Sequence, residues 1–152
     1  MSPSDRLAEL GLTLPDVVPP LAAYVPAIRS GDLVFTAGQV PIRDGSLLHV
    51  GKVGAEVSEA DARACAELCA LNALAAAVSV AGGLDAIQQI VKVVVYVASA
   101  ADFVGQPAVA NGASELLGAV FGDAGQHARS AVGAVSLPLN APVEVDLVVR
   151  AG

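Results

Sequence analysis

Arg129 is the residue in this sequence best suited to binding a small anion. It enters a segment that is typical of a β-strand, and Ala131 and Gly133 fall on the same strand face, because side chains alternate between the two faces. Two of the smallest residues therefore leave space beside the guanidinium. An arginine offers two parallel N–H donors to a carboxylate, so a small carboxylate is the expected ligand.

A carboxylate follows on the next predicted strand. Glu144 and Asp146 point away from the apolar face of that strand, which is formed by Val143, Val145, Leu147 and Val149. An arginine, a space and a nearby carboxylate predict a small anion-binding pocket. The alternative is an ion pair between Arg129 and Glu144 at the end of a sheet, because most charged side chains lie on solvated faces.

Few other polar side chains could join such a pocket. They are Tyr24, Gln39, Asn111, His127 and Ser130. His127 precedes Arg129 by two residues and either joins the site or lies in a surface loop. Tyr24 either belongs to the site or packs a proline-rich arm onto the body. The sequence has no P-loop, dinucleotide-binding, serine-elbow or metal-ligand motif, so we expect neither a cofactor nor a metal.

Composition and charge narrow the function classes. The chain has 152 residues, which predicts a single domain, and it is 55% hydrophobic but only 15% charged. Such a surface is short of charge, so leftover apolar area predicts a homo-oligomer. The formal net charge is −7 and the eight Lys and Arg residues are scattered. An acidic chain without a basic track is not expected to bind nucleic acid.

The two cysteines and the termini indicate a cellular compartment. Cys65 and Cys69 lie in a helical pattern among Ala and Leu, and we interpret them as buried free thiols, which are typical of a reducing cytoplasm. The N-terminus has acidic residues and no apolar signal core, so we expect no secretion signal. The most apolar run, Leu68–Leu84, is shorter than the roughly 20 residues that span a bilayer, so no membrane span is expected.

The predicted elements alternate between strands and helices. A short helix from Ser4 to Leu10, with Ser4 as its N-cap, leads into a proline-rich arm, so residues 1–23 form an extension and residues 24–151 the core. Three strands follow (27–30, 33–39 and 46–50), then a helix (58–81), a strand (90–98), a helix (106–121) and the two C-terminal strands. Gly38 lies inside the second strand and indicates a bulge or a close backbone approach. The order β-β-β-α-β-α-β-β predicts an α+β domain with both helices on one face of one sheet.

Three segments resemble motifs of one known family. Leu33–Pro41 reads LVFTAGQVP, Val91–Phe103 reads VKVVVYVASAADF, and Ala128–Pro138 reads ARSAVGAVSLP, with Glu144 following in register. On these motifs the chain resembles the RidA (YjgF) family of reactive enamine and imine deaminases, as a divergent branch. Some members of that family carry the label endoribonuclease L-PSP. The resemblance covers roughly residues 24–151.

The resemblance implies a chorismate mutase-like fold and a homotrimer, in which strands of three subunits form a central barrel with pockets between neighbours. In that family the arginine matching Arg129 holds the carboxylate of a 2-imino acid, and the glutamate matching Glu144 positions the attacking water. The tyrosine matching Tyr24 closes the pocket, and backbone groups near Ala131 hold the substrate nitrogen. Gly38 and Ser130 complete the expected substrate-binding set.

Ala131 occupies a position where the family commonly has cysteine, and the segment between Phe103 and Gly122 departs from the usual helix pattern. A trimer that binds small carboxylates without turnover, as a sensor, is therefore the alternative to the deaminase. A ribonuclease is disfavoured by the acidic charge.

Overall fold

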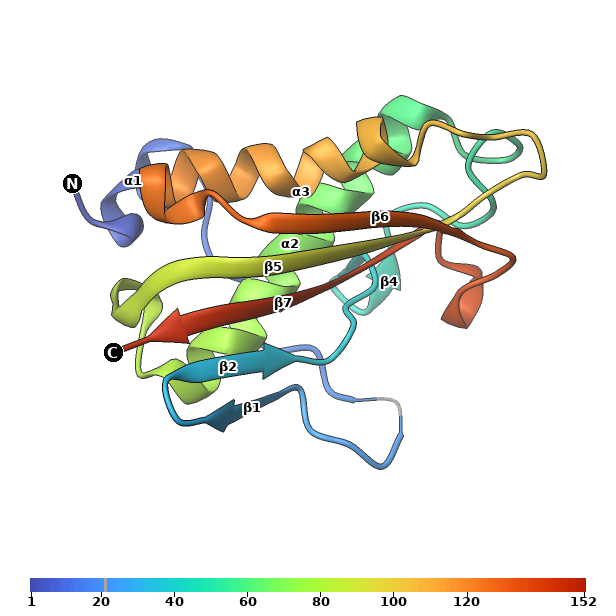
Figure 1. The fold of residues 1–152 in the computed structure, drawn as a ribbon. Coiled ribbons are helices and arrows are strands. Elements are labelled where there is room, and N and C mark those ends of the chain that lie inside the picture. The colour runs from blue at the N-terminus through green and yellow to red at the C-terminus, as the bar shows by residue number, and fades with distance from the viewer. Residues whose placement is uncertain (21) are drawn as a thin grey trace.

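The computed structural model describes residues 1–20 and 22–152, and its centre is a five-stranded mixed sheet (Figure 1). The strands lie in the order β1-β2-β7-β5-β6, and β5 and β6 are parallel, whereas every other neighbouring pair is antiparallel. Their bounds are Ala27–Ser30 (β1), Leu33–Thr36 (β2), Ile87–Ala98 (β5), Ala128–Ala134 (β6) and Val143–Ala151 (β7). The parallel pair is possible because α3 connects β5 to β6 and returns the chain to the same end of the sheet.

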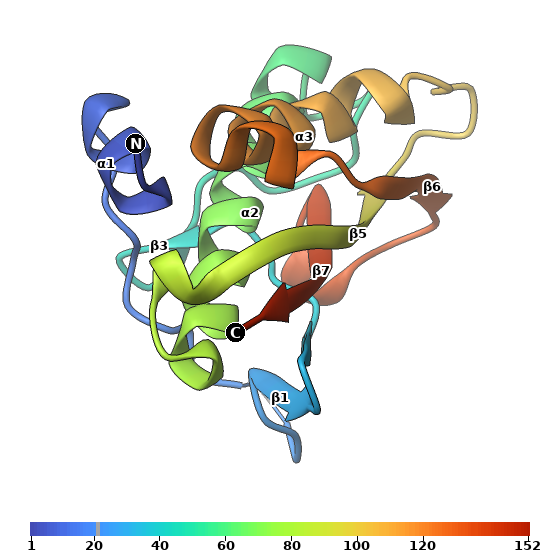
Figure 2. The same cartoon turned by 60° about the vertical axis from the view of Figure 1, so that its left-hand side comes forward.

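Two long helices cover one face of this sheet, as Figures 1 and 2 show from two directions. These are α2 (Glu59–Ala81) and α3 (Gln106–Phe121), and a short helix α1 (Pro3–Glu9) packs near the end of α3. Short 3-10 turns lie at Leu84–Ala86, Gly122–Gly125 and Pro138–Asn140. The predicted α+β class and the two-helix layer are confirmed, and α3 has the predicted bounds.

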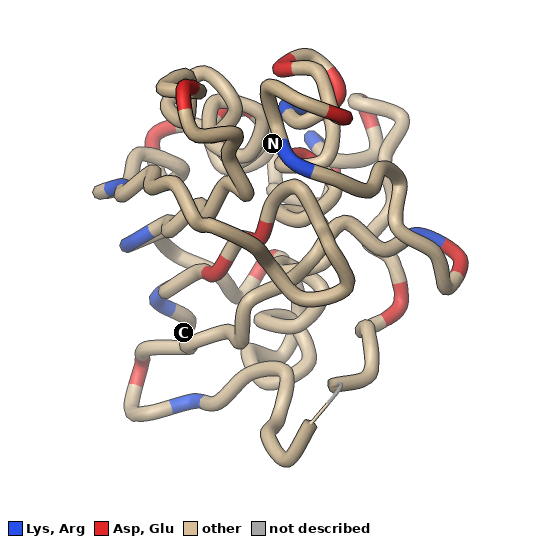
Figure 3. Tube along the Cα trace, turned by 90° about the vertical axis from the view of Figure 1, so that its right-hand side faces the viewer, with Lys and Arg blue, Asp and Glu red and all other residues tan. Residues whose placement is uncertain are grey.

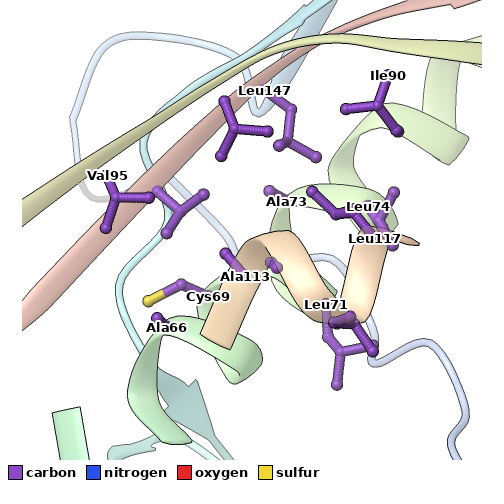
Figure 4. Close-up of a cluster of buried hydrophobic side chains, with 14 of the residues drawn as sticks. Ala66, Cys69, Leu71, Ala73, Leu74, Ile90, Val95, Ala113, Leu117 and Leu147 are labelled. Atoms are coloured by element: carbon purple, nitrogen blue, oxygen red, sulfur yellow. The ribbon is translucent and has the colours of Figure 1, made fainter. Parts of the chain in front are cut away.

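The core lies between the helices and the sheet and is built from small and β-branched residues (Figure 4). In β7 the even alternation of buried and half-buried positions places Val143, Val145, Leu147 and Val149 toward the helices. Alanines on α2 let this helix approach the sheet closely. By length and hydropathy α2 would pass as a membrane span, but 72% of its most apolar window is buried inside the protein, so it is packed as a core helix.

The N-terminal helix starts earlier than predicted. Its N-cap is Ser2 and not Ser4: the Ser2 hydroxyl accepts the Asp5 backbone N–H, and the Asp5 carboxylate accepts the Ser2 N–H. This reciprocal capping box outweighs the signal at Ser4, because Pro3 at the first helical position already has the φ that a helix needs.

The predicted third strand does not join the main sheet. Residues Ser46–Leu47 form β4, which pairs with β3 (Ile42–Arg43) in a separate two-stranded hairpin. The turn between them contains Asp44 at φ 53° and Gly45 at φ +81°, the positive values that a tight two-residue hairpin turn requires. Because the chain reverses there, within a few residues of Pro41, the segment cannot extend along the sheet edge.

The sheet face opposite the helices is uncovered in the single chain. Exposed apolar side chains lie on it, namely Ile28 (60% exposed), Phe35 (40%) and Val132 (43%). The half-buried residues Glu144, Asp146 and Tyr96 share this face, since they alternate with core residues along β7 and β5. A face of this kind is typical of a surface that packs against another chain.

Candidate functional site

Arg129 lies on β6 and reaches toward the helix layer. Its Nη1 donates to Asn111 Oδ1 at 2.8 Å and to Ser114 Oγ at 3.2 Å, both on α3. Its Nη2 is 3.5 Å from the carbonyl oxygen of Pro107. All three acceptors are neutral, and among the described residues no carboxylate lies within ion-pair distance of this guanidinium. The predicted alternative, an ion pair with Glu144, is therefore not formed within the chain.

These contacts leave a defined edge of the guanidinium available. The two N–H groups of Nη1 are both used, whereas Nε and the second N–H of Nη2 have no acceptor among the described residues. Nε and Nη2 lie side by side and can donate two parallel hydrogen bonds to the two oxygens of one carboxylate. The arrangement holds the arginine still while keeping its bidentate edge free.

His127 contacts Ser114, one of the residues that bind this arginine. The ring of His127 lies with Nε2 2.9 Å from Ser114 Oγ and with Nδ1 2.6 Å from the carbonyl oxygen of Gly125. A proton on Nδ1 satisfies the carbonyl, and Nε2 is then the acceptor for the Ser114 hydroxyl proton. Ser114 can therefore accept from Arg129 and donate to His127 at once, so His127 belongs to the surroundings of Arg129 and not to a detached loop.

Glu144 lies on β7, and its carboxylate lies against Gly38. A Cβ on Gly38 would overlap Oε2 and would lie 2.7 Å from the Cδ of Glu144. The backbone beside them is held by two hydrogen bonds between Gln39 and Val145, of 2.8 and 2.9 Å. The predicted bulge or close backbone approach is therefore wrong: Gly38 lies beyond the end of β2 at Thr36, and the side chain of Glu144 is what requires glycine there for space.

Burial changes the acidity of Glu144. Partial removal from water, followed by the nearby charge of Asp146, raises the pKa of the Glu144 carboxyl above its ordinary value. Burial also raises the pKa of Asp146, while a hydrogen bond with Tyr96 acts in the opposite direction. A carboxylate with a raised pKa is a stronger base than one in water, so Glu144 is suited to orienting a water molecule and accepting its proton.

Tyr24 lines a small cavity together with Glu144 and Gly38. The cavity measures about 50 Å³, and its other walls come from the arm (Val18, Pro19, Pro20, Pro26), the segment after β2 (Gln39, Val40, Ile42) and Pro138. Tyr24 is 48% exposed, so about half of this side chain is open to solvent at the cavity. Three of the predicted site residues are therefore brought together within one chain.

Arg129 is not brought to this cavity. In the sheet order, β5 lies between β6 and β7, with Arg129 paired to Val93 and Glu144 paired to Tyr96. Val93 is buried under the helices, whereas Tyr96 belongs to the uncovered face. Arg129 and Glu144 thus lie on opposite faces and two strands apart, so the pocket predicted from their sequence proximity does not exist inside a single chain.

The other predicted residues on β6 divide between the two faces. Ala131 is partly buried on the Arg129 side, while Ser130 pairs with Val94 and faces the opposite way. The expected space along this strand is partly filled, because the Gln106 amide and the Ser99 hydroxyl lie above Gly133, at 3.2 and 3.4 Å from where a Cβ would stand. Among the described residues, no three His, Cys, Asp or Glu side chains converge as a metal site.

A family model described as YjgF/chorismate mutase-like, and as a proposed endoribonuclease, matches residues 4–150. The chain belongs to this YjgF/chorismate mutase-like family. A curated relative, Protein TCP17 of Trypanosoma cruzi, is 40% identical over 146 residues, which cover 95% of this chain and 91% of the relative. The RidA (YjgF) resemblance predicted from three motifs is therefore confirmed over nearly the whole chain.

Three solved structures of other proteins have the same fold. The Agrobacterium tumefaciens protein Atu1372, whose function is described as unknown, is 44% identical with a TM-score of 0.91, and the match covers 99% of this chain and 94% of that one. A candidate endoribonuclease from Shewanella oneidensis is 33% identical with a TM-score of 0.95 over 99% of both chains. TdcF of Escherichia coli, described with bound serine, is 23% identical with a TM-score of 0.61, covers 91% and 93%, and shares the fold.

Proposed function

We propose that this protein is a homotrimeric hydrolase that converts small 2-imino or 2-enamino acids to 2-oxo acids and ammonia, with each site shared by two subunits. The observation that carries the proposal is the state of Arg129: a guanidinium held by neutral acceptors, with its bidentate edge free. A half-buried cation of this kind attracts an anion, and the geometry of the free edge matches a carboxylate.

The separation of the site residues into two groups supports a site formed by two subunits. Tyr24, Gly38 and Glu144 form one half on one side of the sheet, and Arg129 with its α3 partners forms the other. The uncovered sheet face carries exposed apolar residues that a neighbouring subunit would bury. Because β6 is an edge strand of the sheet, a neighbouring chain that packs on this face and past that edge would bring its Glu144 half to Arg129, in the manner of closed cyclic assemblies.

The chemistry requires only positioning and one base. With the substrate carboxylate on Arg129, the C2 carbon of the imine faces a water molecule that hydrogen-bonds to Glu144. The water oxygen forms a bond to C2 as Glu144 takes a proton from it. The C=N electron pair moves to the nitrogen, which takes that proton, so that a 2-amino-2-hydroxy acid forms. Glu144 then takes the hydroxyl proton and passes it to the nitrogen; the O–H pair forms the C=O bond, the C–N bond breaks, and ammonia and the 2-oxo acid leave. Atoms and electrons balance without an oxidant or a second substrate besides water.

The raised pKa of Glu144 suits this role, since the carboxylate must accept a proton and then release it. Tyr24 would exclude bulk water by closing over the cavity, which strengthens the contact between the arginine and its carboxylate partner. The serine described with the distant neighbour TdcF is a small amino acid, a ligand class close to the proposed substrate.

Binding without turnover is the second candidate. Arg129 and its α3 partners suffice to hold a carboxylate, whereas Ala131 supplies no polar side chain next to the reacting centre. A sensor of 2-oxo or 2-amino acids would use the same arginine and would not need Glu144. The endoribonuclease name of the family has less support, because the Lys and Arg positions are interspersed with acidic ones along the described chain (Figure 3) and the net charge is −7.

Ammonia release from freshly generated 2-iminopropanoate tests the proposal. The wild-type protein should accelerate release over buffer, and both Arg129→Ala and Glu144→Ala should abolish the acceleration. Thermal-shift titration with pyruvate separates the second candidate: a sensor would be stabilised by pyruvate in the wild type and in Glu144→Ala, without any ammonia release. Equal ammonia release by all three proteins would contradict the deaminase.

A further inference from the structure

Tyr96 and Asp146 lie beside Glu144 on the uncovered face of the sheet. Their strands, β5 and β7, are neighbours in the middle of that sheet (Figure 1), and the ladder between them pairs Tyr96 with Glu144 and Val94 with Asp146. Tyr96 is therefore opposite Glu144 and diagonal to Asp146, and diagonal neighbours in such a ladder lie within reach of an aromatic side chain. One phenol thus adjoins two carboxylates that share a strand face.

The surroundings of these three side chains make their protons matter. All three are half-buried, and no Lys or Arg in the part of the chain that the structure describes forms an ion pair with Glu144 or Asp146. Two neighbouring carboxylates repel each other when both are ionised, and partial removal from water adds to that cost. The pair therefore binds a first proton readily, and hydrogen bonding selects which carboxylate takes it.

The phenol favours one of the two carboxylates. Burial, followed by the charge of Asp146, raises the pKa of Tyr96, so this side chain keeps its proton and can donate it. Burial raises the pKa of Asp146 too, but the hydrogen bond from Tyr96 acts against this rise by favouring the ionised carboxylate. Glu144 receives no comparable bond from the phenol, and the charge of Asp146 adds to burial in raising its pKa.

We propose that Tyr96 and Asp146 are positioning residues that make Glu144 the proton acceptor of the site: the phenol holds Asp146 ionised, and this fixed negative charge directs the proton of the attacking water to Glu144. The inference rests on the proposed function, in which Glu144 is the base, and adds the groups that select it. The proton moves from water to Glu144 and on to the substrate nitrogen, while Tyr96 and Asp146 neither gain nor lose one.

Two other titratable groups lie near Glu144. Tyr24 of the arm lines the same small cavity, and Cys69 of α2 is close enough for the charge of Glu144 to act on it. Burial, with smaller contributions from the charges of Cys65 and Glu144, raises the pKa of the Cys69 thiol well above its ordinary value. Phenols and thiols of this kind are uncharged at neutral pH, so Asp146 supplies the local negative charge.

Carbon-detected NMR titration of the side-chain carboxyl groups tests the inference without an activity assay. In the wild type, Glu144 should titrate at higher pH than Asp146. Tyr96→Phe removes only the hydroxyl, so the Asp146 midpoint should rise and the gap between the two midpoints should narrow. Asp146→Asn should move the Glu144 midpoint to lower pH. Asp123→Asn, in the exposed turn after α3, removes the same unit of charge elsewhere and should leave the Glu144 midpoint unchanged.

The pH profile of ammonia release adds a readout that a packing defect would not move. The acid limb of kcat/KM reports the base of the free enzyme, so Asp146→Asn should shift this limb to lower pH together with the Glu144 midpoint. Asp146→Glu keeps the charge and should restore the wild-type limb. If Asp146→Asn does not fold, Tyr96→Phe carries the test alone.

Two results would overturn the inference: a Glu144 midpoint that is the same in Asp146→Asn and wild type, or an Asp146 midpoint that Tyr96→Phe leaves in place. Failure of the proposed function looks different. A wild-type protein that releases no ammonia, with all midpoints as expected, would refute the deaminase reaction while confirming that Tyr96 and Asp146 control the protonation of Glu144.

Discussion

Gly38 and the carboxylate of Glu144 occupy adjoining space, so that a Cβ on Gly38 would lie 2.7 Å from the Cδ of Glu144. The contact joins the segment after β2 to β7, two parts of the chain that are far apart in sequence. It holds one half-buried carboxylate beneath Tyr24. The placement of the proposed base therefore depends on a glycine whose backbone conformation is ordinary and whose lack of a side chain is essential.

Gly38→Ala is expected to displace Glu144. The added methyl group overlaps the carboxylate, and overpacking of this kind destabilises proteins by about 1–3 kcal/mol. Deaminase activity should fall at least about tenfold, since the proposed base moves from its place. Urea unfolding and ammonia release measure the two effects. Gly118→Ala, in the exposed part of α3 with no atom near the added methyl, should leave activity unchanged and stabilise the helix by up to about 1 kcal/mol.

The contact between Asn111 and Arg129 gives a paired test of the carboxylate clamp. Asn111→Ala removes an acceptor at 2.8 Å and should raise KM several-fold with little change in kcat, because the guanidinium becomes less well positioned. Asn111→Asp keeps the acceptor but adds a negative charge beside the guanidinium, which competes with a substrate carboxylate. It should therefore raise KM more than Asn111→Ala does. A lower KM in the Asp variant would show that Arg129 does not bind the anion.

Ser114 and His127 should act on the same parameter through the arginine. Ser114→Ala breaks the 3.2 Å contact with Nη1 and the 2.9 Å contact with His127 together, and should raise KM about as much as Asn111→Ala does. Ser114→Thr keeps a hydroxyl at this position and should restore most of the loss. Steady-state kinetics of the two variants check this, and a Ser114→Thr variant no better than Ser114→Ala would indicate a purely packing role.

The raised pKa of Glu144 predicts how stability depends on pH. Since burial and Asp146 raise the pKa in the folded state, the folded protein binds more protons than the unfolded one between the two pKa values. The contribution of Glu144 is therefore most favourable below its unfolded pKa and is lost as pH rises through its folded pKa. Glu144→Gln should be more stable than wild type at about pH 8, and urea unfolding at about pH 4 should show a smaller difference. A variant less stable than wild type at the higher pH would contradict the assignment.

The cysteines should be unreactive until the protein unfolds. Both are buried and free, and removal from water, with a smaller contribution from the charge of Asp61, raises the pKa of the Cys65 thiol to about 11. At about pH 8 only roughly one thiol in a thousand would then be ionised. A thiol-specific chromogenic reagent should report no fast reaction in the native state and two thiols in guanidinium chloride. Rapid labelling of the native protein would contradict the core packing.

Local patterns in the sequence predicted most of the fold and only part of the site. The alternation along β7 placed Glu144 away from the core, and the helix signals around Gln106 and Gly122 bounded α3, because these depend on neighbours within a few residues. The pairing of strands, in contrast, does not depend on nearby residues alone. That β5 lies between β6 and β7 is decided by packing of the whole chain, so the separation of Arg129 from Glu144 could not be predicted from their spacing.

The sequence contained only weak indications of the hydrogen bonds made by two polar residues, His127 and Asn72. The sequence pattern favoured a surface loop for His127, because its partner Ser114 lies on a helix whose rotation about its axis the sequence does not specify closely. Asn72 stands as a lone amide in an apolar helical run, which is the one signal that could have marked it as a buried hydrogen-bonding residue. The homotrimer and the cytoplasmic location remain predictions.

Mixing two inactive variants tests the central claim most directly. Arg129→Ala and Glu144→Ala should each fail to release ammonia from 2-iminopropanoate, because each destroys one half of every site. If the halves come from different subunits, refolding the two variants together at equal concentrations should rebuild both halves at about one quarter of the interfaces and restore about that share of wild-type activity. A mixture as inactive as its components, or either variant active alone, would contradict a site that Arg129 and Glu144 complete across a subunit boundary.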